Sequence, residues 1–191
     1  MYIFIIDVRG IFMKKVLILS TSLRTNANSE ILAKETERGA KDAGHSVEFV
    51  SLKDKNIQFC KGCLACQKLG RCVINDDAND ITSKIKEADV IVWATPVYYY
   101  EMCGQMKTLI DRANSLFATG KNFSEVYVIT TSADSSPNTV QTVINGVNGW
   151  IACFDGVKLS GYLNGGGLEA PNDAAANQEL LEKAYNLGKN I

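Results

Sequence analysis

Residues 14–30 (KKVLILSTSLRTNANSE) restrict the possible folds of this chain more than any other stretch. Residues 16–19 are all apolar, as expected for a strand that is buried on both faces of a parallel sheet. The next nine residues, 20–28, mostly carry hydroxyl or amide groups, and a helix pattern begins at Ser29. Such a loop places hydroxyls and free N–H groups at a positive helix end, which suits a phosphate. The alternative is an ordinary capped connection, but this usually needs only about two to six residues, so the length favours an anion site.

The rest of the chain alternates between helix and strand patterns. Further strands are expected at residues 46–52, 89–94, 125–131 and 157–163, and helices at residues 29–43, 76–88, 104–117, 140–154 and 173–190. Residues 165–167 are three consecutive glycines and are expected to form a loop. Alternating strands and helices indicate a doubly wound α/β sheet. With the phosphate-type loop after the first strand, the pattern fits a flavodoxin-like three-layer sandwich with a five-stranded parallel sheet in the order 2-1-3-4-5.

Three unusual loops should meet at one edge of this sheet. In doubly wound sheets, ligands bind beyond the carboxyl ends of the strands. The polar loop at 20–28, the aromatic loop at 95–103 (TPVYYYEMC) and the small polar loop at 131–137 each follow a strand, so we expect them to line one site. The tyrosines at 98–100 suit a flat ring system that carries a monophosphate, although at least one of them is expected to cover the core instead.

Several common phosphate-binding motifs are absent. The sequence has no GxGxxG after the first strand, which a dinucleotide fold requires, and no GxxxxGK[ST], which a P-loop nucleotidase requires. A phosphatase of similar topology would need a cysteine nucleophile in residues 20–28, and there is none. These absences leave a phosphate that is held without a lysine or a metal.

The sequence resembles the NAD(P)H-dependent FMN reductases of flavodoxin-like fold, from about Met13 to the end of the chain. The motifs that carry the resemblance are the loop residues Ser20, Ser22, Arg24, Asn28 and Ser29, the segments 95–99 (TPVYY) and 106–112 (MKTLIDR), and the segment 184–191. The family commonly has glycine where this chain has Thr21 and Ala27.

The resemblance implies a non-covalent FMN whose phosphate lies in the first loop. Its isoalloxazine ring would lie against Pro96, Val97, Tyr98 and Tyr99 on one side and against Thr131, Ser132, Ala133 and Asp134 on another. The resemblance further implies hydride transfer from NAD(P)H, electron transfer to a flavin, a quinone or another small molecule, and a homodimer or homotetramer with the flavin near the interface. No catalytic acid or base is predicted, because the cofactor carries the chemistry.

Four of the six cysteines, Cys60, Cys63, Cys66 and Cys72, lie within thirteen residues. In a cytosolic chain, clustered cysteines more often indicate metal or redox chemistry than disulfides. Their spacing resembles the compact motif of the iron–sulfur flavoproteins, a branch of the same family, and four thiolates suit a [4Fe–4S] cluster. Two alternatives stay open: zinc, although its paired CxxC motifs usually lie farther apart, and a redox-active thiol segment without a metal. Asp111 and Arg112 are expected to form an ion pair within their helix or at an interface.

Composition narrows the remaining functions. The net charge of −1 and the absence of a basic run give no sign of nucleic acid or of a membrane surface as partner. The weak charge also argues against an acidic, flavodoxin-type electron carrier. That carrier and a cysteine-based metal or redox sensor are the alternatives to an enzyme whose partner is a small-molecule acceptor or a redox protein. We predict a cytoplasmic chain with one flavodoxin-like domain at residues 13–191, cysteine-rich at 60–72, and an N-terminal extension at residues 1–12, either a mis-called start or an added segment.

Overall fold

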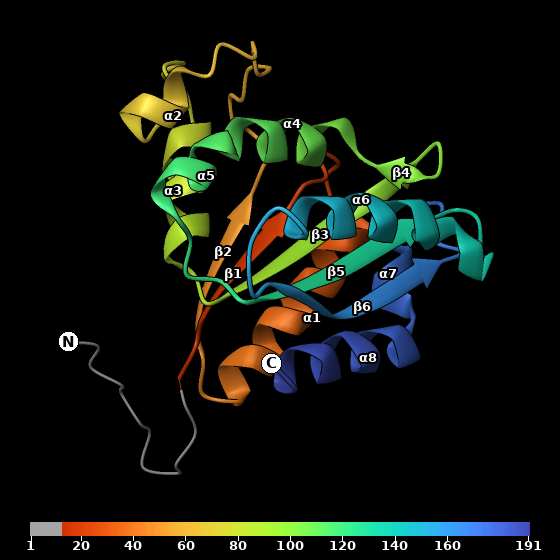
Figure 1. The fold of residues 1–191 in the computed structure, drawn as a ribbon. Coiled ribbons are helices and arrows are strands. Elements are labelled where there is room, and N and C mark those ends of the chain that lie inside the picture. Colours follow the sequence, from red (N-terminus) through yellow and green to blue (C-terminus); the bar gives the residue numbers. More distant parts are fainter. Residues whose placement is uncertain (1–12) are drawn as a thin grey trace.

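The computed structural model describes residues 13–191, and the predicted N-terminal extension at residues 1–12 lies outside this range. Five parallel strands form a sheet in the order β2-β1-β3-β5-β6 (Figure 1). These strands are β1 (Lys15–Ser20), β2 (Ser46–Ser51), β3 (Val90–Tyr98), β5 (Glu125–Ser132) and β6 (Lys158–Gly166). The order is the one predicted for a flavodoxin-like fold, which is thereby confirmed.

Side chains of β1 alternate between two cores because successive residues of a strand point to opposite faces. Val16 and Ile18 pack in the core that lies under α1 and α8, whereas Leu17 and Leu19 pack in the core on the other face. Each such buried aliphatic side chain contributes about 1.5–3 kcal/mol. The sheet therefore lies between two helical layers (Figure 1).

The helices divide between these layers. The face with α1 (Asn28–Asp42) also carries α7 (Asp173–Ala176) and α8 (Gln178–Lys189), and the opposite face carries α3 (Ala78–Glu87), α4 (Gly104–Arg112) and α6 (Gln141–Ile151). The shorter elements are α2 (Ala65–Leu69), η1 (Ala113–Ser115), α5 (Leu116–Thr119) and η2 (Pro137–Val140). No helix in residues 13–191 is long and apolar enough to cross a membrane.

Helices α1 and α8 touch backbone to backbone. A Cβ atom added to Gly188 would overlap the carbonyl oxygen of Thr36, and one added to Gly39 would overlap the carbonyl oxygen of Tyr185. The Thr36 hydroxyl donates a hydrogen bond to the carbonyl of Ala184 (2.9 Å) across this contact. The glycines therefore allow a close crossing that fixes α1, the helix that follows the polar loop.

The sheet has a sixth strand that the sequence did not predict. It lies within the expected loop, and β3 also extends into that loop beyond residue 94. Thr95 and Pro96 continue the pairing with β5. Past Tyr98 the chain turns back as the short antiparallel strand β4 (Glu101–Met102). The expected loop at residues 95–103 is thus a β-hairpin.

Three other expected boundaries are corrected. Gly165 and Gly166 belong to β6 and pair with the end of β5, although consecutive glycines suggested a loop. The helix expected over residues 173–190 is divided into α7 and α8 at Asn177, whose side chain caps α8 by accepting a hydrogen bond from the N–H of Leu180. The helix expected over residues 104–117 is divided into α4, η1 and α5.

Candidate functional site

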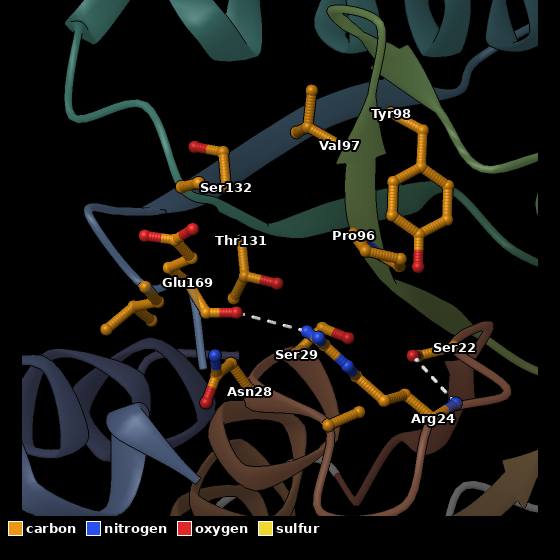
Figure 2. A pocket seen from close by; sticks show the side chains of 13 residues that line it. Ser22, Arg24, Asn28, Ser29, Pro96, Val97, Tyr98, Thr131, Ser132 and Glu169 are labelled. Atoms are coloured by element: carbon orange, nitrogen blue, oxygen red, sulfur yellow. Dashed lines mark hydrogen bonds between the residues drawn. The ribbon is translucent and has the colours of Figure 1, made fainter. Parts of the chain in front are cut away.

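A cavity of about 200 Å³ opens at the carboxyl edge of the sheet. Its walls come from the loop after β1, the end of β3, the end of β5 and the segment after β6 (Figure 2). The lining residues are Ser22, Arg24, Ala27, Asn28, Ser29, Pro96, Val97, Tyr98, Thr131, Ser132, Ala133, Leu168 and Glu169. The three loops that were expected to converge therefore do meet at one site.

Three of the predicted binding residues lie outside this cavity. The hydroxyl of Ser20 is directed away from it and donates to the carboxylate of Glu30 (3.1 Å). Tyr99 is fully exposed at the hairpin tip. The carboxylate of Asp134 accepts a hydrogen bond from the N–H of Ser136 (2.8 Å), and this bond in particular lowers the pKa of Asp134. The remaining ten predicted residues line the cavity.

The start of α1 presents unsatisfied donors to the cavity. The first N–H groups of a helix have no partner within the helix. No side chain caps α1 at Ala27, so these groups also lack a side-chain acceptor. The hydroxyl of Ser29 is fully buried and has no hydrogen-bond partner in the part of the chain that the structure describes. A buried hydroxyl without a partner costs about 1–3 kcal/mol. This helix end is therefore chemically incomplete and suited to an anion.

Asn28 and Arg24 both hold the segment that follows β6. The side chain of Asn28 donates to the carbonyl of Ala170 (2.8 Å) and accepts from the N–H of Ala174 (3.0 Å). The guanidinium of Arg24 reaches across the cavity to the carbonyl of Glu169 (3.2 Å), as Figure 2 shows. The amide of Asn28 is thus occupied by the protein itself, whereas Arg24 keeps its charge at the mouth of the cavity.

Sequence reasoning did not find Ala27, Leu168 or Glu169. The side chain of Ala27 carries no polar group. Leu168 and Glu169 follow β6, whose end was expected at residue 163 but lies at residue 166. The one available signal was position, because the segment after the last parallel strand must leave the sheet at its carboxyl edge.

The hairpin between β3 and β4 has a strained tip. Tyr99 (φ 51°) and Tyr100 (φ 63°) both adopt the left-handed backbone conformation, which costs about 1–2 kcal/mol for a residue with a side chain. The hydroxyl of Tyr100 lies 3.4 Å from a carboxylate oxygen of Asp134 and so connects this tip to the loop after β5. Strain of this kind is concentrated at functional sites.

The four clustered cysteines line a second, smaller cavity of about 40 Å³. All four are free thiols, and two of the sulfurs accept hydrogen bonds: Cys60 from the N–H of Gly62 (3.4 Å) and Cys66 from the amide of Asn114 (3.3 Å). Within residues 13–191, no three potential ligands are gathered closely enough to hold a metal ion. The cysteines therefore surround one space without forming a closed metal site.

A buried ion pair fixes this cysteine segment. The side chains of Arg112 and Asp76 are both fully buried and form a two-pronged contact (2.6 and 2.8 Å), so the expected pairing of Arg112 with Asp111 is wrong. Burial alone would raise the pKa of Asp76, but the hydrogen bonds from Arg112 and from the N–H groups of Gln58 and Ala78 outweigh burial and lower it. The pKa of Arg112 is raised, chiefly by the hydrogen bond to Asp76.

Comparison with known proteins identifies the family of the chain. Residues 14–162 match the NADPH-dependent FMN reductase family. An iron-sulfur flavoprotein of Methanocaldococcus jannaschii is 32% identical over 183 residues, which cover 93% of this chain and 95% of that protein. An iron-sulfur flavoprotein of Archaeoglobus fulgidus is 32% identical over 184 residues, which cover 94% of this chain and 79% of that protein.

Among solved structures, an NAD(P)H:quinone oxidoreductase from Methanothermobacter marburgensis superposes with a TM-score of 0.68 at 17% identity, covering 93% of this chain and 96% of that one. This likeness establishes the fold alone, and the sequence matches establish the family. The chain belongs to the NADPH-dependent FMN reductase family, close to its iron-sulfur flavoprotein branch.

Proposed function

We propose that this protein is an FMN-dependent oxidoreductase that takes hydride from NAD(P)H and passes the electrons to a small-molecule acceptor. One observation carries the proposal: the buried Ser29 hydroxyl has no partner in residues 13–191 and lies at the uncapped start of α1, inside a cavity built by the three converging loops. A phosphate monoester would supply the acceptors that this helix end lacks. The family match supports FMN as its carrier.

The lining residues suit the two parts of FMN. Ser22, Ser29 and the first N–H groups of α1 would bind the phosphate, with Arg24 as a positive charge at the cavity mouth. The ring would lie against the end of β3, at Pro96–Tyr98, and against the end of β5, at Thr131–Ala133. These two walls are paired strands, with Pro96 opposite Thr131, so the spacing between them is fixed by the sheet.

When bound, FMN supplies the hydride acceptor and the electron donor, and the protein need only position it. The lining residues offer hydroxyls, backbone N–H groups and apolar surface, together with the charged side chains of Arg24 and Glu169, and none of them is assigned as an acid or base. We therefore expect orientation of the ring, rather than proton transfer, to be the main contribution of the protein.

We further propose that Cys60, Cys63, Cys66 and Cys72 hold a [4Fe–4S] cluster. Four free thiols around one cavity have the right donor chemistry, and N–H groups that donate to the cysteine sulfurs are typical of such clusters. The iron-sulfur flavoprotein relatives support this choice over zinc or empty thiols. A cluster would exchange single electrons. Cys60 and Cys63 are exposed and lie on irregular backbone, so we expect this stretch to rearrange when a cluster is loaded.

The cysteine segment adjoins the first loop. A cavity of about 300 Å³ is lined by Leu23 from that loop and by Ile57 and Phe59, which precede Cys60. We propose that a second copy of the chain covers this region in a homodimer or homotetramer, because Phe59, Leu23 and Tyr99 expose apolar surface there and at the hairpin tip.

All six cysteines are free, which supports a reducing, cytoplasmic location.

The absorption spectrum of anaerobically purified protein, before and after NADPH or NADH, tests the proposal. We expect a flavin spectrum that is bleached by one of the two nucleotides. A flavin that neither nucleotide reduces would instead indicate a non-catalytic electron carrier. No bound flavin, and none taken up on titration with FMN, would refute the proposed function and favour a cysteine-based sensor. Iron, sulfide and zinc analysis of the same sample decides between a cluster, zinc and free thiols.

A further inference from the structure

Arg112 occupies an unusual position between the sheet and the cysteine segment. It is the last residue of α4, its side chain is fully buried, and it lines the same cavity as the four cysteines. Its terminal nitrogens donate to the Asp76 carboxylate and to two backbone carbonyls, those of Gln58 (2.7 Å) and Ile74 (3.2 Å). These two carbonyls lie on either side of the cysteines in sequence, so one guanidinium holds both ends of the segment.

One donor of this guanidinium is left over. The Nε atom of Arg112 is buried and has no hydrogen-bond partner in the described part of the chain. Buried side-chain donors are normally hydrogen-bonded, so this one is an exception. Cys72 lines the same cavity as Arg112. An unsatisfied, positively charged donor beside a set of thiols is suited to an anionic group bound between them.

We propose that Arg112 is a positioning residue of the cysteine site, which holds the segment in place and sets the reduction potential of the cluster through its buried charge. The inference rests on the proposed [4Fe–4S] cluster. Reduction adds one negative charge to the cluster and its four thiolates, and a buried positive charge favours that added charge. The carboxylate of Asp76 offsets part of this effect, because it lies against the same guanidinium.

This arrangement predicts opposite effects for the two members of the ion pair. Arg112→Gln removes the positive charge, so at a fixed potential the ratio of reduced to oxidised cluster should fall about tenfold, a shift of about 59 mV for a one-electron couple. Asp76→Asn removes the opposing negative charge, so the ratio should rise. Both substitutions loosen the same anchor, and loosening alone would move both potentials in one direction. The sign of the shift therefore separates charge from structure.

The experiment is a mediated redox titration with dithionite on the full chain, reconstituted with iron and sulfide under anoxic conditions and followed by electron paramagnetic resonance. Arg71→Gln is the matched control, because Arg71 precedes Cys72 in sequence but is exposed to solvent, which screens its charge. Arg112→Lys keeps the charge and loses the planar fork. If Asp76→Asn does not fold, Arg112→Lys should still lie closer to the wild type than Arg112→Gln does.

The outcomes distinguish this inference from the proposed function. Opposite shifts, or a potential that follows charge across the Arg112 variants, support the role of Arg112. A wild-type protein that holds a cluster, with no shift or with shifts of one sign in every variant, overturns the role of Arg112 and leaves the cluster intact. If the reconstituted wild type takes up neither iron nor sulfide, the role of Arg112 and the proposed cluster are both overturned. FMN binding is measured separately on the same sample.

Discussion

Replacement of Ser29 by alanine should have opposite effects on the empty protein and on its affinity for FMN. In the flavin-free chain, the hydroxyl of Ser29 is fully buried without a partner in residues 13–191, so it lowers stability by about 1–3 kcal/mol. Ser29→Ala removes the unpartnered hydroxyl and its destabilising effect, and it also places a better helix former in α1. The free energy of unfolding of the flavin-free protein should therefore rise.

With FMN, the same hydroxyl should gain a charged hydrogen-bond partner in the phosphate. A hydrogen bond to a charged group contributes about 1.5–3 kcal/mol, so the dissociation constant of FMN should increase about 10- to 150-fold in Ser29→Ala. Riboflavin has the same ring but no phosphate, so its affinity should stay unchanged. The ratio of the two dissociation constants therefore isolates the phosphate contact.

Both quantities can be measured on one preparation. Urea unfolding gives the stability of the flavin-free protein, and fluorescence titration gives the affinities for FMN and riboflavin. Ser160→Ala is the control, because it removes a hydroxyl from β6 outside the cavity and should change neither affinity. An equal loss for FMN and riboflavin, or a less stable flavin-free variant with unchanged FMN affinity, would refute the assignment of this helix end as the phosphate site.

Three further predictions follow from other parts of the molecule. Gly188→Ala should lower the free energy of unfolding by about 3 kcal/mol or more, because the new methyl group meets backbone, whereas Gly149→Ala, which has open space around it, should raise stability by about 0.5–1 kcal/mol; urea titrations of both check this. Asp76→Asn should cost about 3 kcal/mol at neutral pH. Since the folded state lowers the pKa of Asp76 below 3.8, the wild type loses this stability as pH falls below that value and the variant should not, which acid unfolding curves would show. Tyr99→Gly relieves a left-handed conformation, so it should leave stability unchanged or higher while weakening self-association in sedimentation experiments; undiminished association would contradict the proposed interface.

The sequence predicted the sheet well because the apolar runs of β1, β3 and β5 have no other stable environment than a buried parallel sheet. It predicted the place of the cavity for the same reason, since strand order alone determines which loops meet. It could not predict which polar side chains of the loop keep an unpaired group at the cavity. Ser20 and Asn28 have the same composition signal as Ser29, but the first two bond to the protein itself.

Contacts between distant segments were also beyond the sequence. Arg112 and Asp76 are 36 positions apart, and no helical or strand periodicity connects them, so the sequence suggested only the neighbouring Asp111 as a partner. In the structure, Asp111 instead pairs with Lys107 one turn away (2.6 Å). The hairpin at Tyr98 was missed because a proline and three tyrosines resemble a loop in composition, although β-sheet pairing continues through them.

The close crossing of α1 and α8 also bears on how the protein is made. Thr36 and Ala184, which meet at this crossing, are 148 positions apart, so α1 leaves the ribosome long before its partner exists. During that interval the side of α1 that α8 covers stays exposed to solvent, although the side that faces the sheet has its partners. Closing so long a loop is slow compared with forming local structure. The proposed flavin site should therefore reach its full affinity only after α8 has been synthesised, and nascent chains that stop before it should be targets for chaperones.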